Sequence, residues 1–216
     1  SPPDHALTDP VGIVPSGGSP GMRKAMVVSD SSVMHAWLSG CLTDAFPGMR
    51  VVAVTLGGVV TATFSRAPQD LLLVDCSRGL DARLIEMFGH QGPTPTIAVA
   101  IDAADPVLMD ALRAGASACL IASRSRTRAI TALHQIVIGE PPMPAPLARR
   151  LLMHYDDHAR SSGAQVPPMR LELLAAMSRG MSLAEAAVWL GVNRVQAAKE
   201  LRGAYRELTV SQAQAA

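Results

Sequence analysis

The chain has 216 residues, of which 49% are hydrophobic, so it can bury a sizeable core in one or two domains. Its formal net charge is +1, and aromatic residues make up 3% of it. These values exclude a strongly basic nucleic-acid coat and disfavour stacking on single-stranded bases, so affinity for DNA would need a local patch. No stretch approaches the roughly 18 uninterrupted apolar residues of a membrane span, and no basic-then-apolar leader opens the chain, so we expect a cytoplasmic protein without membrane contact.

Residues 1–22 are rich in proline, serine and glycine, which favours a flexible leader. From residue 23 to 139, short apolar runs alternate with longer stretches of helical spacing. The runs that predict strands are 25–28, 51–54, 71–74, 96–99 and 118–121. The stretches that predict helices are 33–46, 82–88, 104–114 and 127–138. Five β-α units indicate a flavodoxin-like, doubly wound α/β domain whose functional edge lies at the carboxyl ends of parallel strands.

The residues that follow the predicted strands form a candidate site at that edge. In chain order they are Ser29, Asp30, Asp75, Ala100 and Ala122. With the run Arg113–Ala116 before the fifth strand, this pattern resembles the receiver domain of response regulators in two-component systems. The resemblance implies that Asp75 is the phosphoacceptor candidate, and that Asp30, Asp75 and the backbone carbonyl of Ser77 are magnesium ligands.

The rest of the receiver site is missing. Ser29 replaces one acid, Ala100 replaces the hydroxyl that reads the phosphoryl group, and Ala122 replaces the lysine that pairs with it. Without that lysine, no cation neutralises the charge that develops on the phosphoryl oxygens during phosphotransfer. Arg124 or Arg126 could reach back to the site and replace the lysine. We therefore expect a pseudo-receiver with weak or absent phosphotransfer and no required cofactor. Two interpretations of the carboxylates stay open: weak Mg²⁺ binding, or capping of helices and loops.

The residues at this edge of the sheet suggest ways of regulating the protein other than phosphorylation. Cys76 would be redox-sensitive if it were exposed and held as thiolate, and would be inert packing otherwise. The vacated acidic pocket could take a small ligand, while constitutive activity controlled by expression is the simplest case. The three cysteines, an odd number without metal-ligand spacing, argue against a disulfide framework and a zinc site.

A break in composition follows at residues 140–165. The segment opens with the proline-rich run Glu140–Pro146, which is stiff and should fix the spacing between domains. Helical spacing at 147–155 then gives way to a polar stretch at 156–165, so we assign this segment as a linker with one helix.

Residues 166–210 predict three short helices with two tight junctions. Gly180 can end the first helix in a left-handed conformation, and Ser182 with Glu185 forms a capping box that starts the second. Gly191 ends the second helix and Asn193 caps the third, which would run from Arg194 to about Leu208. This is the layout of a helix-turn-helix, and residues 211–216 would be a tail.

The predicted third helix has an apolar stripe and a basic face. Ala197, Leu201, Ala204 and Leu208 share one side, and the opposite side is cationic. The basic face is either a solvated surface or a helix that reads the major groove. The candidate DNA-binding residues are Asn193, Arg194, Gln196, Lys199, Arg202 and Arg206.

From Leu173 to Val210 the chain resembles the LuxR-type helix-turn-helix that ends NarL/FixJ-class response regulators. Three residues depart from the family pattern: Glu200 and Glu207 weaken the positive field, and Gly203 lies in the middle of a helix. The resemblance implies a cytoplasmic transcription regulator that is not an enzyme, binds double-stranded DNA and forms a homodimer. The alternative is a pseudo-receiver module that sequesters another regulator, a protein partner, without binding DNA. A third hypothesis is an ordinary regulator switched by phosphorylation of Asp75.

Overall fold

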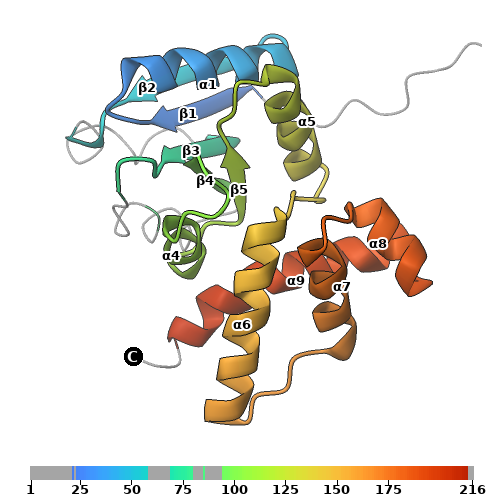
Figure 1. Cartoon of the computed structure of the whole chain (residues 1–216). Coiled ribbons are helices and arrows are strands. Elements are labelled where there is room, and N and C mark those ends of the chain that lie inside the picture. The colour runs from blue at the N-terminus through green and yellow to red at the C-terminus, as the bar shows by residue number, and fades with distance from the viewer. Residues whose placement is uncertain (1–20, 22, 58–68, 80–84, 86–93, 214–216) are drawn as a thin grey trace, which may run out of the picture.

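The computed structural model describes residues 21, 23–57, 69–79, 85 and 94–213, and Figure 1 shows how their helices and strands are arranged. Most of the predicted leader and most of the predicted helix at 82–88 lie outside these residues. The described chain forms an α/β domain followed by a helical domain, which confirms the predicted fold class.

A five-stranded parallel sheet is the centre of the first domain. Its strands are β1 (Lys24–Val28), β2 (Arg50–Val54), β3 (Leu71–Asp75), β4 (Thr96–Ala100) and β5 (Ala118–Ile121). They lie in the order β2-β1-β3-β4-β5, and every neighbouring pair is parallel. The order is that of a flavodoxin-like sheet, and the central strands β3 and β4 are buried along their whole length, as continuous apolar runs predict.

Helices cover both faces of the sheet. On one face α1 (Ser32–Ala45) and α5 (Arg126–Val137) pack against each other and against alternate strand residues such as Leu73 and Val99. On the other face lies α4 (Val107–Arg113), which begins three residues after the predicted start at 104. The difference arises because the Asp102 and Asp105 side chains accept backbone N–H bonds from Ala104 and Val107, which holds the preceding residues in turns.

Four helices form the C-terminal part: α6 (Ala145–Ser162), α7 (Pro168–Ser178), α8 (Leu183–Leu190) and α9 (Arg194–Ala213). The helix α6 extends through the polar stretch that follows residue 155, because Arg160 pairs with Asp156 at 2.7 Å and the chain turns only at the left-handed Gly163. The helix α9 is five residues longer than the predicted end at Leu208.

The two domains share one core. Apolar residues of the sheet face under α4 join those of α6, α7, α8 and α9 in a single buried cluster, and α9 itself contacts α4. Figure 1 shows the four C-terminal helices gathered below α5, with α6 beside α4. No helix in the described ranges has the length and apolar character needed to cross a membrane.

Candidate nucleic-acid interface and strand-end site

The junctions of the helix-turn-helix form as the sequence predicts. Gly180 and Gly191 both adopt positive φ, 91° and 69°. The Ser182 hydroxyl accepts the N–H of Glu185 at 3.2 Å, and the Glu185 carboxylate accepts the N–H of Ser182 at 2.8 Å. Asn193 Oδ1 accepts the N–H of Gln196 at 2.8 Å and so caps α9. The reciprocal bonds of Ser182 and Glu185 fix the junction of α7 with α8, and Gly191 with the Asn193 cap fixes the junction of α8 with α9.

The predicted apolar stripe of α9 is its buried side. Its four members are at most 1% exposed and face α7 and α8: Ala197, Leu201, Ala204 and Leu208. Among the candidate DNA-binding residues, Arg202 is half-buried and the other five are exposed: Asn193, Arg194, Gln196, Lys199 and Arg206. A helix with one packed side and these polar groups on its surface can reach base edges and phosphates.

A second side of α9 is covered by the linker and the receiver-like domain. Arg194 Nε and Nη2 donate to the Glu140 carboxylate at 2.6–3.0 Å, and Arg202 Nη1 donates to the Gly139 carbonyl at 2.6 Å. The Tyr205 hydroxyl donates to the Pro142 carbonyl, and Ala198 is 3% exposed. Two of the six candidate DNA-binding residues, Arg194 and Arg202, are therefore engaged within the chain.

Sequence reasoning did not identify this docking side. The sequence does contain a signal for it: positions 194, 198, 202 and 205 recur at helical spacing and so share one side of the helix. Two of these positions are an alanine and a tyrosine, whereas a face in water would be polar. A pattern of one helix cannot tell whether such a side meets DNA or another domain.

The three departures from the family pattern surround one arginine of α7. Arg170, 9% exposed, donates from Nε to Glu200 at 3.2 Å and pairs through Nη1 with Glu207. Its guanidinium lies over the α9 backbone at Gly203, where a Cβ would collide with it. Glu200, Gly203 and Glu207 thus form an internal clamp with Arg170, which we call the Arg170 clamp.

At the sheet edge, Asp75 is 6% exposed and held by two serines. Ser29 Oγ donates to Asp75 Oδ2 at 2.6 Å, and the Ser77 hydroxyl and N–H donate to Asp75 Oδ1 at 2.6 and 2.9 Å. Asp30 accepts the N–H of Leu56 at 2.9 Å. These bonds are the ones that the capping interpretation of the two carboxylates requires.

The remaining strand-end positions offer no replacement for the missing groups. Ala100 is fully buried in the core, and Ala122 bonds to it through the backbone at 2.8 Å. Arg126 lies on the far side, where Nε pairs with Asp44 of α1 at 3.3 Å, so it does not reach Asp75 as one prediction allowed. Within the described residues no group of three or more His, Cys, Asp or Glu side chains is placed to hold a metal.

The three cysteines are free and buried, as the absence of a pairing or metal pattern predicts. Burial and the neighbouring Asp75 carboxylate raise the pKa of the Cys76 thiol to about 12, and burial raises that of Cys119 to about 11. Thiols with such pKa values are protonated near neutral pH, so the geometry at Cys76 fits packing rather than redox sensing.

No family model matches the chain. The glycerol metabolism activator of Pseudomonas putida is 26% identical over 132 residues, which is 59% of this chain and 60% of that protein, so the match spans less than two thirds of the curated relative. The RcsB response regulator of Salmonella enterica serovar Typhimurium, solved bound to promoter DNA, is 15% identical with a TM-score of 0.50 over 87% of this chain and 92% of that one. A LuxR family DNA-binding response regulator from Silicibacter pomeroyi is 22% identical with a TM-score of 0.47, over 58% of this chain and 98% of that one.

At such identities the likeness to RcsB concerns the fold, and the fold agrees with the sheet order and the capped helices described above. The chain therefore has a fold similar to that of RcsB, a five-stranded α/β domain followed by a helical domain that contains a helix-turn-helix.

Proposed function

We propose that this protein is a DNA-binding transcriptional regulator without enzymatic activity of its own. The observation that carries the proposal is the pair of capped junctions, α7 with α8 and α8 with α9, which hold α9 with Gln196, Lys199 and Arg206 exposed. Lysine and arginine in this setting bind phosphates and guanine edges, and a two-fold dimer would read half-sites about one helical turn apart or a multiple of it.

DNA binding requires the two domains to separate in part. Ala198 and Arg202 lie on the side of α9 that meets Gly139 and α4, and the exposed Arg194 is paired with Glu140, so these residues are not free to contact a duplex in this arrangement. We propose that the arrangement described here is the closed form and that an open form binds DNA. The apparent affinity for DNA is then the affinity of the open form multiplied by the fraction of protein that is open.

Control of this opening is proposed to be independent of phosphorylation. Asp75 is enclosed by Ser29 and Ser77, and Ala100 and Ala122 stand where a switch hydroxyl and a lysine would be needed. A regulator of the ordinary phosphorylated kind predicts instead that a phosphodonor with Mg²⁺ adds the mass of a phosphoryl group at Asp75 and changes the oligomer. Unchanged intact mass in folded protein supports our proposal.

The alternative of a protein-interaction module rested on Glu200, Gly203 and Glu207. Their contacts within the Arg170 clamp give these residues a structural role, so they no longer favour loss of DNA binding.

The proposal is tested by selecting duplexes from a random pool at moderate salt. The unmodified protein is compared with the Lys199→Ala/Arg206→Ala variant, since both side chains are exposed and neither contacts the linker. Enrichment of a palindromic site by the unmodified protein and its loss in the variant supports a reading face on α9. No enrichment by either protein, with folding confirmed by circular dichroism, favours the interaction module.

A further inference from the structure

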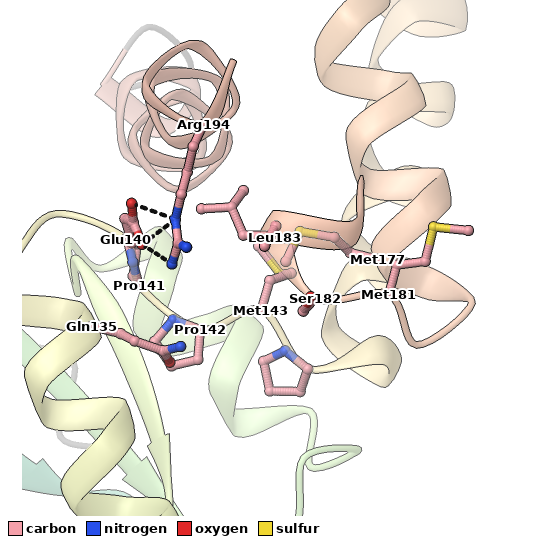
Figure 2. A pocket seen from close by; sticks show the side chains of 12 residues that line it. Gln135, Glu140, Pro141, Pro142, Met143, Met177, Met181, Ser182, Leu183 and Arg194 are labelled. Atoms are coloured by element: carbon pink, nitrogen blue, oxygen red, sulfur yellow. Dashed lines mark hydrogen bonds and ion pairs between the residues drawn. The ribbon is translucent and has the colours of Figure 1, made fainter. Parts of the chain in front are cut away.

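A cavity of about 460 Å³ lies between the linker and the helix-turn-helix (Figure 2). Pro142 and Met143 of the linker form one wall, and Met177, Met181 and Leu183 form the other. Small-molecule sites in proteins have volumes of roughly 300–1,000 Å³ and are mostly apolar with a few polar groups. The volume and lining of this cavity match that description.

The apolar part of the cavity is adaptable. Three of its lining residues are methionines, whose unbranched thioether chains change rotamer easily to fit a flexible aliphatic group. Met143, Met177 and Leu183 are each at most 9% exposed, so they form the buried floor of a cavity that is half open to water. Burial of an aliphatic chain there supplies the apolar share of a binding free energy.

One polar group at the cavity has unused donors. Arg194 donates from Nε and Nη2 to the Glu140 carboxylate, and the Glu140 side chain is 16% exposed. The remaining nitrogen of Arg194, Nη1, has no partner among the described residues. Figure 2 shows Arg194 and Glu140 together on one side of the cavity, with Met177 and Met181 on the other. An acceptor that binds Nη1 would share the guanidinium with Glu140, which suits a single negative charge and repels a dianion.

We propose that this cavity binds a small aliphatic monocarboxylate, with its carboxylate on Arg194 Nη1 and its chain among Met143, Met177 and Met181. The occupant is a free small molecule, because a half-open space of this volume between the linker and the helix-turn-helix admits a single short chain rather than a membrane surface.

Binding at this place favours the closed form. Both domains build the walls, so the cavity exists only while the helix-turn-helix docks on the linker, and a ligand shifts an equilibrium toward the state that binds it better. The carboxylate thus acts against DNA binding. This consequence rests on the proposed function, whereas binding in the cavity does not.

The probe is octanoate, with octanol and acetate as matched compounds that lack the charge or the chain. Binding to the full-length protein is followed by isothermal titration calorimetry and by saturation-transfer NMR. Ala184 borders the cavity from α8 and is exposed, so Ala184→Phe fills the space while Ala184→Ser leaves it open. The variant Arg194→Gln removes the guanidinium together with its bonds to Glu140, so octanoate and octanol are compared within this one variant, where any loss of closure affects both compounds.

We expect octanoate to bind the unmodified protein and the Ala184→Ser variant, and to bind Ala184→Phe at least about tenfold more weakly, which is 1.4 kcal/mol. Octanol should bind more weakly than octanoate, and Arg194→Gln should abolish this preference, a readout that a structural role of Arg194 would not change. Equal binding to Ala184→Phe and Ala184→Ser, or an unchanged preference in Arg194→Gln, overturns the site.

The effect on DNA is measured separately, on a duplex from the random-pool selection. Octanoate at saturation should weaken duplex binding by the unmodified protein and leave that of Ala184→Phe unchanged. If octanoate binds but duplex affinity does not fall, the assignment of the site to the closed form is wrong. If no duplex is bound with or without octanoate, the proposed function fails while the calorimetric result on the cavity stands.

Discussion

Arg202 Nη1 donates to the backbone carbonyl of Gly139 at 2.6 Å, which joins the middle of α9 to the last residue of the receiver-like domain. Three residues further along the same helix side, the Tyr205 hydroxyl donates to the Pro142 carbonyl. The short segment from Gly139 to Pro142 thus contacts α9 at two points. Closure of the protein therefore depends on polar contacts as well as on the shared core.

Removal of the Tyr205 hydroxyl should loosen this closure. Tyr205→Phe keeps the buried ring and loses the bond to Pro142, at a cost of about 0.5–1.5 kcal/mol in unfolding free energy. Because the lost bond exists only in the closed form, duplex affinity should rise, as measured by fluorescence anisotropy.

Tyr155→Phe is the matched control for that variant. The Tyr155 hydroxyl donates to the Ala204 carbonyl and joins α6 to α9, both of which lie in the C-terminal helical part. Its removal should lower stability by a similar amount without raising duplex affinity. Equal effects of the two variants on DNA binding would show that Tyr205 does not restrain opening.

The Arg170 clamp predicts that the effect of Gly203→Ala depends on residue 170. In the unmodified protein the added Cβ displaces the guanidinium from Glu200 and Glu207, so we expect Gly203→Ala to destabilise. Arg170→Met alone should cost about 2 kcal/mol, because hydrogen bonds to charged groups are lost. With Met at position 170, Gly203→Ala should instead stabilise by about 0.5–1 kcal/mol through helix propensity. Urea unfolding of the four proteins measures the coupling, and additive effects would contradict the clamp.

The contact between α6 and α4 should make stability depend on pH. Burial lowers the pKa of His154, as do the positive Arg113 and the stacked His158 ring, against an opposing effect of Asp157. A lowered pKa means that the folded protein prefers the neutral ring, so this contribution is complete above the ordinary value of about 6.5 and is lost as pH falls below it. We expect the Tm to fall between pH 7 and 5, with a shallower slope in His154→Gln. The half-buried neighbour His158 offers a control, since His158→Gln leaves the burial of His154, the largest cause of its lowered pKa, and should keep most of the slope.

The cysteines should be inert in the folded protein. All three are buried, and the raised pKa values of Cys76 and Cys119 leave few thiolates at neutral pH. Treatment with a disulfide reagent at pH 7.5 should label none of the thiols in the folded protein and all three in denaturant. Rapid labelling of Cys76 in the folded protein, located by peptide mass spectrometry, would contradict this prediction and support a redox-sensing role for Cys76.

Much of the fold follows from local signals in the sequence. Short apolar runs predicted all five strands to within about a residue at each end, because buried parallel strands leave no room for polar side chains. The capping box at Ser182 and the left-handed Gly191 are local chemistry and formed as predicted. The polar extension of α6 was missed because an ion pair and one glycine, rather than an apolar stripe, set its end.

The candidate site was harder to predict from the sequence than the fold. The exposure of Lys199 follows from helical spacing, but the engagement of Arg194 with Glu140 joins residues 54 positions apart, which no pattern along one helix contains. For the same reason Glu200 and Gly203 were read as losses on a DNA-binding face, although Arg170 on another helix explains them both.

Salt dependence of duplex binding tests the central claim most directly. Affinity for a selected duplex is measured by anisotropy at several salt concentrations, for the unmodified protein, Tyr205→Phe and Lys199→Ala/Arg206→Ala. We predict a steep fall of affinity with salt, and a log-log slope shallower by about one for each phosphate contact removed in the double variant. Folded protein with no duplex affinity at any salt, even with Tyr205→Phe, or a slope unchanged in the double variant, would contradict a DNA-reading α9.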